Sequence, residues 1–251
     1  MDTSLRDRFI DLWKRYFKNA ELPLVFFYNN EIGTADTGPK PRPKPRNHSC
    51  LICDLNKVRN GQSLAFGSEN IGCAGGRRYA GFTDQLSEDF EYFLSCGKMG
   101  MEGERYKNDP ETVRLMMEDF PTIRKHDQWL IFKRWDQLTE TDEPEVAVFF
   151  AQPDVLSGLF MLANYDFVGN AGVISPFSSG CGSIILYPYL EKDKEKPRSV
   201  VGMFDPSARP CVKENELTFS TPFSRLKQLI DYMEESFLIT DTWKTIHQRM
   251  Q

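Results

Sequence analysis

The sequence predicts a single α+β domain, in which a mixed or antiparallel sheet is covered by helices from the two ends of the chain. The chain has 251 residues, of which 40% are hydrophobic and 13% aromatic, and this composition is sufficient for one sizeable core. Segments with helical and strand patterns are mixed without a regular βαβ order, which favours α+β over a doubly wound sheet. Neither an internal repeat nor a break in composition divides residues 1–251, so we expect one domain.

The first predicted elements are a helix and a strand. Apolar residues such as Leu5, Phe9 and Trp13 recur with helical spacing between residues 4 and 18. The short aromatic-rich run Leu22–Tyr28 is typical of a strand. Alternating prolines in Pro39–Arg46 then favour an extended polyproline II segment on the surface. This segment is either a stiff solvated connector or a ligand for an aromatic-lined groove.

The later elements follow the same rules. Helices are predicted where apolar residues recur with a helical period, and these are Ser49–Asn60, Pro110–Phe120, Asp154–Tyr165, Phe223–Phe237 and Asp241–Met250. Strands are predicted at short apolar runs, and these are Ser63–Phe66, Trp129–Trp135, Glu145–Phe150, Ile184–Tyr187 and Ser199–Phe204. The polar segments Thr34–Asn47 and Glu191–Arg198 are expected to be exposed loops, where a protease cuts first.

Charge and hydropathy indicate a cytoplasmic protein. The net charge of −5 provides no broad basic field, so we expect neither nucleic-acid nor membrane binding. The N-terminus lacks the apolar core of a signal peptide, and the most apolar later stretch, Val146–Tyr165, is interrupted by Pro153 and Asp154. Because disulfides are rare in the cytoplasm, we expect all six cysteines to be free thiols or metal ligands.

Several standard sites are excluded by their missing signatures. The sequence contains no GxxxxGK[ST] loop, GxSxG turn or HExxH helix, and Gly180-Cys181-Gly182 does not continue into a dinucleotide-binding fingerprint. The three histidines, His48, His126 and His247, are too few for a histidine-rich metal site. The carboxylates show no spacing that singles out an acid–base pair.

Four cysteines carry the most information. Cys50 and Cys53 form a CxxC at the start of a predicted helix, where backbone N–H groups favour thiolates. Cys73 and Cys181 lie in glycine-bearing turns, which allow close approach of the backbone to a ligand. From the residues alone, a shared metal site, reactive thiols and simple core packing all remain open.

The surroundings of these cysteines resemble a known family, domain of unknown function 169. Gly72-Cys73-Ala74-Gly75-Gly76, followed by Tyr79 and Gly81-Phe82, is similar to its Cys-x-Gly-Gly signature, although the family more often has proline where this chain has Ala74. Further similar positions are Cys53, Cys181 ahead of Tyr187-Pro188, Gly202, Arg209, Glu216 and Pro222-Phe223. The resemblance runs from about Leu22 to the end. It implies a prokaryotic cytoplasmic protein of unestablished activity, and Cys50 stands as an addition to the family pattern.

The resemblance matches three of the four cysteines and strengthens the metal hypothesis. We expect Cys50, Cys53, Cys73 and Cys181 to ligate zinc or an iron–sulfur cluster, and Cys53, Cys73 and Cys181 to converge in space. A small anionic ligand is expected beside them; its candidate residues are Gly75, Gly76, Arg77 and Arg209.

Roles that involve no ligand or metal also remain open for these residues. Arg77 is alternatively a solvent-facing side chain, and Arg209 alternatively forms a structural ion pair, for which Glu216 is a candidate partner. His48 is an optional ligand, whereas Cys96 and Cys211 need only be ordinary thiols. The alternative functions are a cysteine-dependent enzyme, an anion-binding module without metal, and a binding protein whose cysteines only pack.

Overall fold

The computed structural model describes residues 1–38 and 50–250, and it confirms a single α+β domain. The predicted polyproline segment Pro39–Arg46 and the optional ligand His48 lie outside the described residues. Within the described part, no helix is both long and apolar enough to cross a bilayer.

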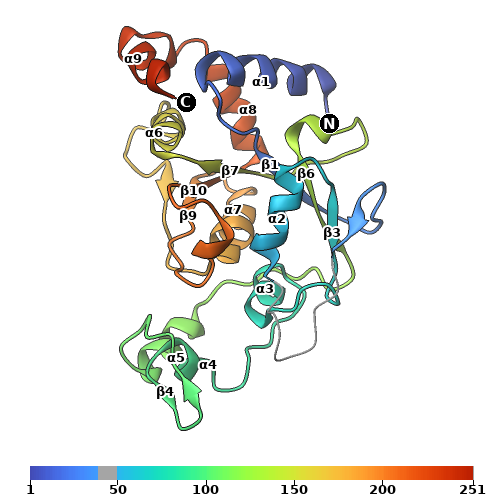
Figure 1. Cartoon of the computed structure of the whole chain (residues 1–251), viewed down its shortest axis with the longest axis vertical. Helices are drawn as coiled ribbons and strands as arrows, with labels where there is room; N and C mark the ends of the chain where they lie inside the picture. Colours follow the sequence, from blue (N-terminus) through green and yellow to red (C-terminus); the bar gives the residue numbers. More distant parts are fainter. Residues whose placement is uncertain (39–49, 251) are drawn as a thin grey trace.

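A mixed sheet forms the centre of the molecule (Figure 1). In the described residues its eight strands have the order β2-β3-β6-β1-β7-β10-β9-β8. Their bounds are β1 Leu24–Asn29, β2 Asp36–Thr37, β3 Leu64–Phe66, β6 Trp129–Arg134, β7 Val146–Ala151, β8 Val173–Ile174, β9 Ser199–Gly202 and β10 Leu217–Pro222. The inner strands pair antiparallel, with Phe26 opposite Phe132 between β1 and β6. The two outermost pairs, β2–β3 and β8–β9, are parallel.

One face of the sheet is covered by helices from the two ends of the chain, as the sequence predicted. These are α1 (Thr3–Tyr16), α8 (Phe223–Tyr232) and α9 (Asp241–Arg249), and α6 (Pro153–Ala163) from the middle of the chain joins them. The alternation of side chains along each strand sends Val25, Phe149 and Phe219 to this face. There the Trp13 ring of α1 lies 5.1 Å from the Phe149 ring, between centroids. The burial of these aromatic side chains holds both chain ends to the sheet.

The opposite face is covered by α2 (Leu51–Arg59) and by a π-helix, η2 (Gly182–Leu186), that continues into α7 (Tyr187–Glu191). The predicted strand at Ile184–Tyr187 is therefore wrong. This run is apolar because it is buried on all sides, and a short buried helix has the same pattern as a buried strand. The π-helix approaches the sheet closely at Gly202, where an added Cβ would lie 2.0 Å from the Cβ of Ser183.

A small lobe extends from the end of the molecule opposite the chain termini (Figure 1). It contains α4 (Phe90–Leu94), β4 (Gly97–Lys98), β5 (Met101–Glu102) and α5 (Pro110–Glu118), and α3 (Ala74–Tyr79) lies between the lobe and α2. The lobe contacts the main body through Tyr106, which donates to Asp205 at 3.4 Å, and through Lys107, whose ammonium lies 4.0 Å from the Phe177 ring centroid. Of the predicted exposed loop Glu191–Arg198, residues 193–196 are exposed, whereas Glu191 is the buried last residue of α7.

Candidate cysteine site

Cysteines stand at the start of three helices that lie on the α2 side of the sheet. Cys50 immediately precedes α2, Cys73 precedes α3 and Cys181 precedes η2. Cys211 is the last residue of a short 3-10 turn, Arg209–Cys211, that packs against α2. Cys181 and Cys211 are both buried in the core between α2, η2 and the sheet, and Cys50 packs against it. The fold thus gathers cysteines from four separate segments.

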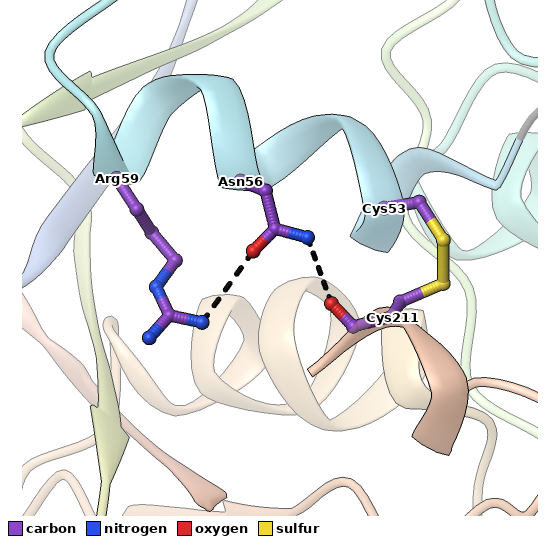
Figure 2. The surroundings of a disulfide bond; sticks show 4 residues. All are labelled: Cys53, Asn56, Arg59 and Cys211. Carbon is purple, nitrogen blue, oxygen red and sulfur yellow. Dashed lines mark hydrogen bonds between the residues drawn. A yellow bond between two sulfur atoms is a disulfide. The ribbon is translucent and has the colours of Figure 1, made fainter. Parts of the chain in front are cut away.

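The tightest group is a triad made of Cys50, Cys53 and Cys211, whose Sγ atoms all lie within 4.8 Å of one another. Within it, Cys53 and Cys211 form a disulfide (Figure 2). The expectation that all six cysteines are unpaired is therefore wrong, and so is the minor role expected for Cys211. The two residues are 158 positions apart in the sequence. No spacing rule indicates such a pair, because only the tertiary fold brings the two segments together.

Hydrogen bonds from side chains to backbone carbonyl groups hold the Cys211 segment against α2. The side-chain amide of Asn56, one turn after Cys53, donates to the Cys211 carbonyl oxygen at 2.9 Å (Figure 2). Arg209 holds the following segment, since its guanidinium donates to the carbonyl oxygens of Glu216 and, at 2.6 Å, of Glu214. The expected ion pair between the Arg209 and Glu216 side chains is replaced by this backbone contact. The Glu216 carboxylate instead accepts from Arg59 at 2.8 Å.

Cys73 and Cys181 lie on two sides of Gly76. A Cβ added at Gly76 would lie 3.6 Å from the Cβ of Cys73, 3.9 Å from the Sγ of Cys181 and 2.9 Å from Cγ2 of Ile71. Glycine is needed here because a larger residue would push these neighbours apart. The segment expected to be a glycine-rich turn is in fact the first turn of α3, which begins at Ala74.

Burial disfavours the thiolate forms of Cys50 and Cys181. Burial raises the pKa of the Cys181 thiol well above its usual value, and the neighbouring Cys50, Cys73 and Asp205 add to the rise. Burial also raises the pKa of Cys50; hydrogen bonds from the N–H groups of Cys53 and Ile52 oppose this, while Cys73 and Asp205 again raise it. These mutual effects place Cys50, Cys73 and Cys181 in one electrostatic neighbourhood. A cation that displaces the thiol protons would relieve the repulsion among the sulfurs.

Asp205 connects this neighbourhood to the lobe. Its carboxylate accepts from the backbone N–H groups of Gly180 at 3.3 Å and Ser207 at 3.0 Å, and from the Tyr106 hydroxyl. Burial raises the pKa of Tyr106 to about 12, with Glu104 and Asp205 contributing. Asp205 follows Met203, a buried non-glycine residue with a φ of 69°. Such a left-handed conformation costs free energy and is maintained by surrounding contacts, here beside the turn in which Asp205 accepts from Gly180, the residue before Cys181.

The residues expected to bind an anion are spread more widely. Gly75 lies near the Cys73 sulfur, which an added Cβ would approach to 3.7 Å, whereas Arg77 is exposed on α3. Arg209 is engaged by the carbonyl oxygens named above. Anion binding by Gly75, Gly76, Arg77 and Arg209 therefore stays a prediction. Cys96 lies in the lobe, exposed and beside β4.

The fold and the site define an α+β protein in which cysteines from separate segments gather beside a central sheet. A family model described as "Uncharacterised ArCR, COG2043" matches residues 21–231 of the chain. The protein therefore belongs to the DUF169 family, in agreement with the resemblance seen in the sequence. No curated protein and no solved structure matches it.

Proposed function

We propose that the reduced protein binds a metal centre through the thiolates of Cys50, Cys53 and Cys211. The observation that carries this proposal is the separation of the three Sγ atoms, all within 4.8 Å of one another. Two thiolates on a tetrahedral zinc ion, each at about 2.3 Å from the metal, are separated by roughly 3.8 Å. The triad therefore needs only small side-chain adjustments to close around one ion.

The choice of metal follows from the ligand type. Thiolate sulfur is a soft ligand that selects zinc, copper(I) and iron–sulfur centres over magnesium or calcium. Cys73 and Cys181 interact electrostatically with Cys50, so either is a candidate for the fourth thiolate of zinc or iron. A three-thiolate site that kept its fourth position open would have the form of a catalytic centre.

The disulfide sets the condition for metal binding. With Cys53 and Cys211 bonded to each other, Cys50 is the one free thiol of the triad. Reduction by two electrons and two protons supplies the other two thiols, and the metal then displaces their protons. We therefore expect tight metal binding by the reduced chain and weak binding by the oxidised chain.

A metal titration tests this proposal. The full chain is purified without oxygen, treated with a chelator, reduced and titrated with zinc against a chromophoric competitor; iron and sulfide are measured in untreated material. One zinc per chain is expected for the reduced protein. Replacement of Cys50, Cys53 or Cys211 by serine should weaken binding at least about 10-fold. Cys73→Ser and Cys181→Ser show whether these residues complete the ligand set.

The matched control is Cys96→Ser, because Cys96 is exposed in the lobe and is no member of the triad. It should bind zinc like the unaltered chain, and circular dichroism should show that every variant is folded. Equal zinc affinity in the triad variants and in the control would contradict the proposal. So would the absence of both tight zinc binding and iron in the reduced protein.

A further inference from the structure

The three sulfurs of the triad differ in accessibility and in bonding. Cys53 is exposed, Cys50 is half-buried and Cys211 is buried. Cys53 is bonded to Cys211, and the free thiol of Cys50 lies within 4.8 Å of both bonded sulfurs. Thiol–disulfide exchange requires a free thiol beside a disulfide, because attack on one sulfur releases the other. The structure meets this requirement within a single chain.

We infer that Cys50, Cys53 and Cys211 form a thiol–disulfide exchange centre, which reacts with external dithiols at Cys53. In the internal step, the Cys50 thiolate attacks the Sγ of Cys53. The Cys50–Cys53 bond forms, the Cys53–Cys211 bond breaks, and Cys211 leaves as a thiolate that takes up the proton lost by Cys50. The centre neither gains nor loses electrons in this step.

The external step transfers two electrons. One thiolate of a dithiol attacks the Sγ of Cys53, the exposed residue of the bonded pair, forming a mixed disulfide and releasing Cys211 as a thiolate. The second thiol of the dithiol then attacks its partner sulfur and releases Cys53. The dithiol is oxidised to a disulfide, and the two cysteines are reduced to thiols. Cys53 is the point of entry because Cys211 is only 8% exposed.

The structure holds Cys211 within reach by contacts that do not involve sulfur. The Asn56 side chain donates to the Cys211 carbonyl (Figure 2). The Cys211 N–H donates to the Ala208 carbonyl at 3.0 Å. Both bonds can persist when the disulfide changes partner. Cys50 and Cys53 are fixed on the other side by the first turn of α2. Cys53 can therefore alternate between Cys50, three residues away, and Cys211.

This activity does not depend on the proposed metal function. It belongs to the oxidised chain, and no metal takes part in any step. Its test is therefore carried out with a chelator present, so that failure to exchange and failure to bind metal are separate results.

Disulfide mapping of the full chain provides the test. The protein is purified without reductant, incubated without oxygen with a trace of dithiothreitol, alkylated and digested with trypsin. Peptide 47–57 carries Cys50 and Cys53, and peptide 199–213 carries Cys211. We expect two populations: crosslinked peptides with Cys50 alkylated, and an internal bond in peptide 47–57 with Cys211 alkylated. The second should reach at least about a tenth of the chains.

Three variants sharpen the test. Cys50→Ser should keep the crosslink alone, Cys211→Ser should form the internal bond alone, and Cys96→Ser should match the unaltered chain. In Cys50→Ser, glutathione should form its mixed disulfide on peptide 47–57. The inference is overturned if the unaltered chain contains only the crosslink after a day and Cys211→Ser forms no internal bond. A glutathione adduct on peptide 199–213 instead would overturn the assignment of Cys53 as the entry point.

Discussion

Removal of the Cys53–Cys211 disulfide should lower the stability of the whole domain. The bond joins residues 158 positions apart, so it restricts the unfolded chain over more than half of its length. The loop-closure relation gives a stabilisation of about 5 kcal/mol at 25 °C for a loop of this size. The free energy of unfolding of a domain is about 5–15 kcal/mol, so this one bond accounts for a large share of it.

Urea unfolding of the oxidised and reduced proteins measures this effect. The rings of Trp13, Trp135 and Trp243 are buried in the core under the terminal helices, so their fluorescence reports the loss of tertiary structure. With a slope of about 3 kcal/mol per molar urea, a stabilisation of about 5 kcal/mol should separate the two midpoints by roughly 1.7 M. The slope should be steeper for the reduced chain, because its unfolded state exposes more surface.

Two variants distinguish the effect of this disulfide on unfolding from the effect of reducing the other cysteines. Cys211→Ser should unfold like the reduced protein even under oxidising conditions, since a bond between Cys50 and Cys53 closes only a short loop. Cys96→Ser should unfold like the oxidised protein. Coincident midpoints for oxidised and reduced protein would refute the reasoning. They would mean that contacts such as the Asn56–Cys211 hydrogen bond already determine the stability of this region.

Two further predictions concern ion pairs away from the cysteines. A hydrogen bond from Arg225 holds the pKa of Asp166 below its ordinary value, so this pair stabilises the fold above about pH 4, and the contribution is lost as pH falls through the lowered pKa. Asp166→Asn should flatten the acid limb of a plot of unfolding free energy against pH, and an unchanged limb would show that other carboxylates control it. Lys133→Met should cost about 3 kcal/mol in urea unfolding, because it leaves the buried Asp142 carboxylate without the ammonium that contacts both its oxygens at 2.8 and 2.9 Å. Lys133→Met combined with Asp142→Leu should recover most of this loss, and equal losses in the two variants would contradict the explanation.

Periodicity in the sequence located most of the framework. The helices at both ends and strands β1, β6 and β7 follow from repeated apolar residues, because these elements bury one face or form the middle of the sheet. Strand β10, which pairs with both β7 and β9, was missed. Its core is Thr218-Phe219-Ser220-Thr221, in which a single aromatic residue stands among small polar ones. Thr218 and Ser220 alternate with Phe219 and so lie on the opposite face of the strand, toward the closely packed π-helix; only the tertiary structure explains their small size.

The candidate site was predictable in part for a similar reason. The CxxC spacing placed Cys50 and Cys53 together on the first turn of a helix, since that proximity is local. Cys211 carries no such signal, because its approach to Cys53 depends on Asn56 and on the turn that Arg209 holds. Arg209, two residues before Cys211, did match a position of the family pattern. That match indicated that the segment is important, but it suggested that Arg209 binds an anion and not that it positions the segment carrying Cys211.

The edges of the sheet bear on how this chain avoids self-association. A wide sheet exposes unpaired N–H and C=O groups at its two borders, and long flat borders recruit strands from other molecules. Here the border strands β2 and β8 contain two residues each, and both pair parallel with their neighbours, unlike the strands inside the sheet. The charged Asp36 is exposed on β2 and accepts a hydrogen bond from Gln62 at 2.9 Å. Such short borders offer little template for cross-β growth, and the broad sheet can remain confined to one molecule.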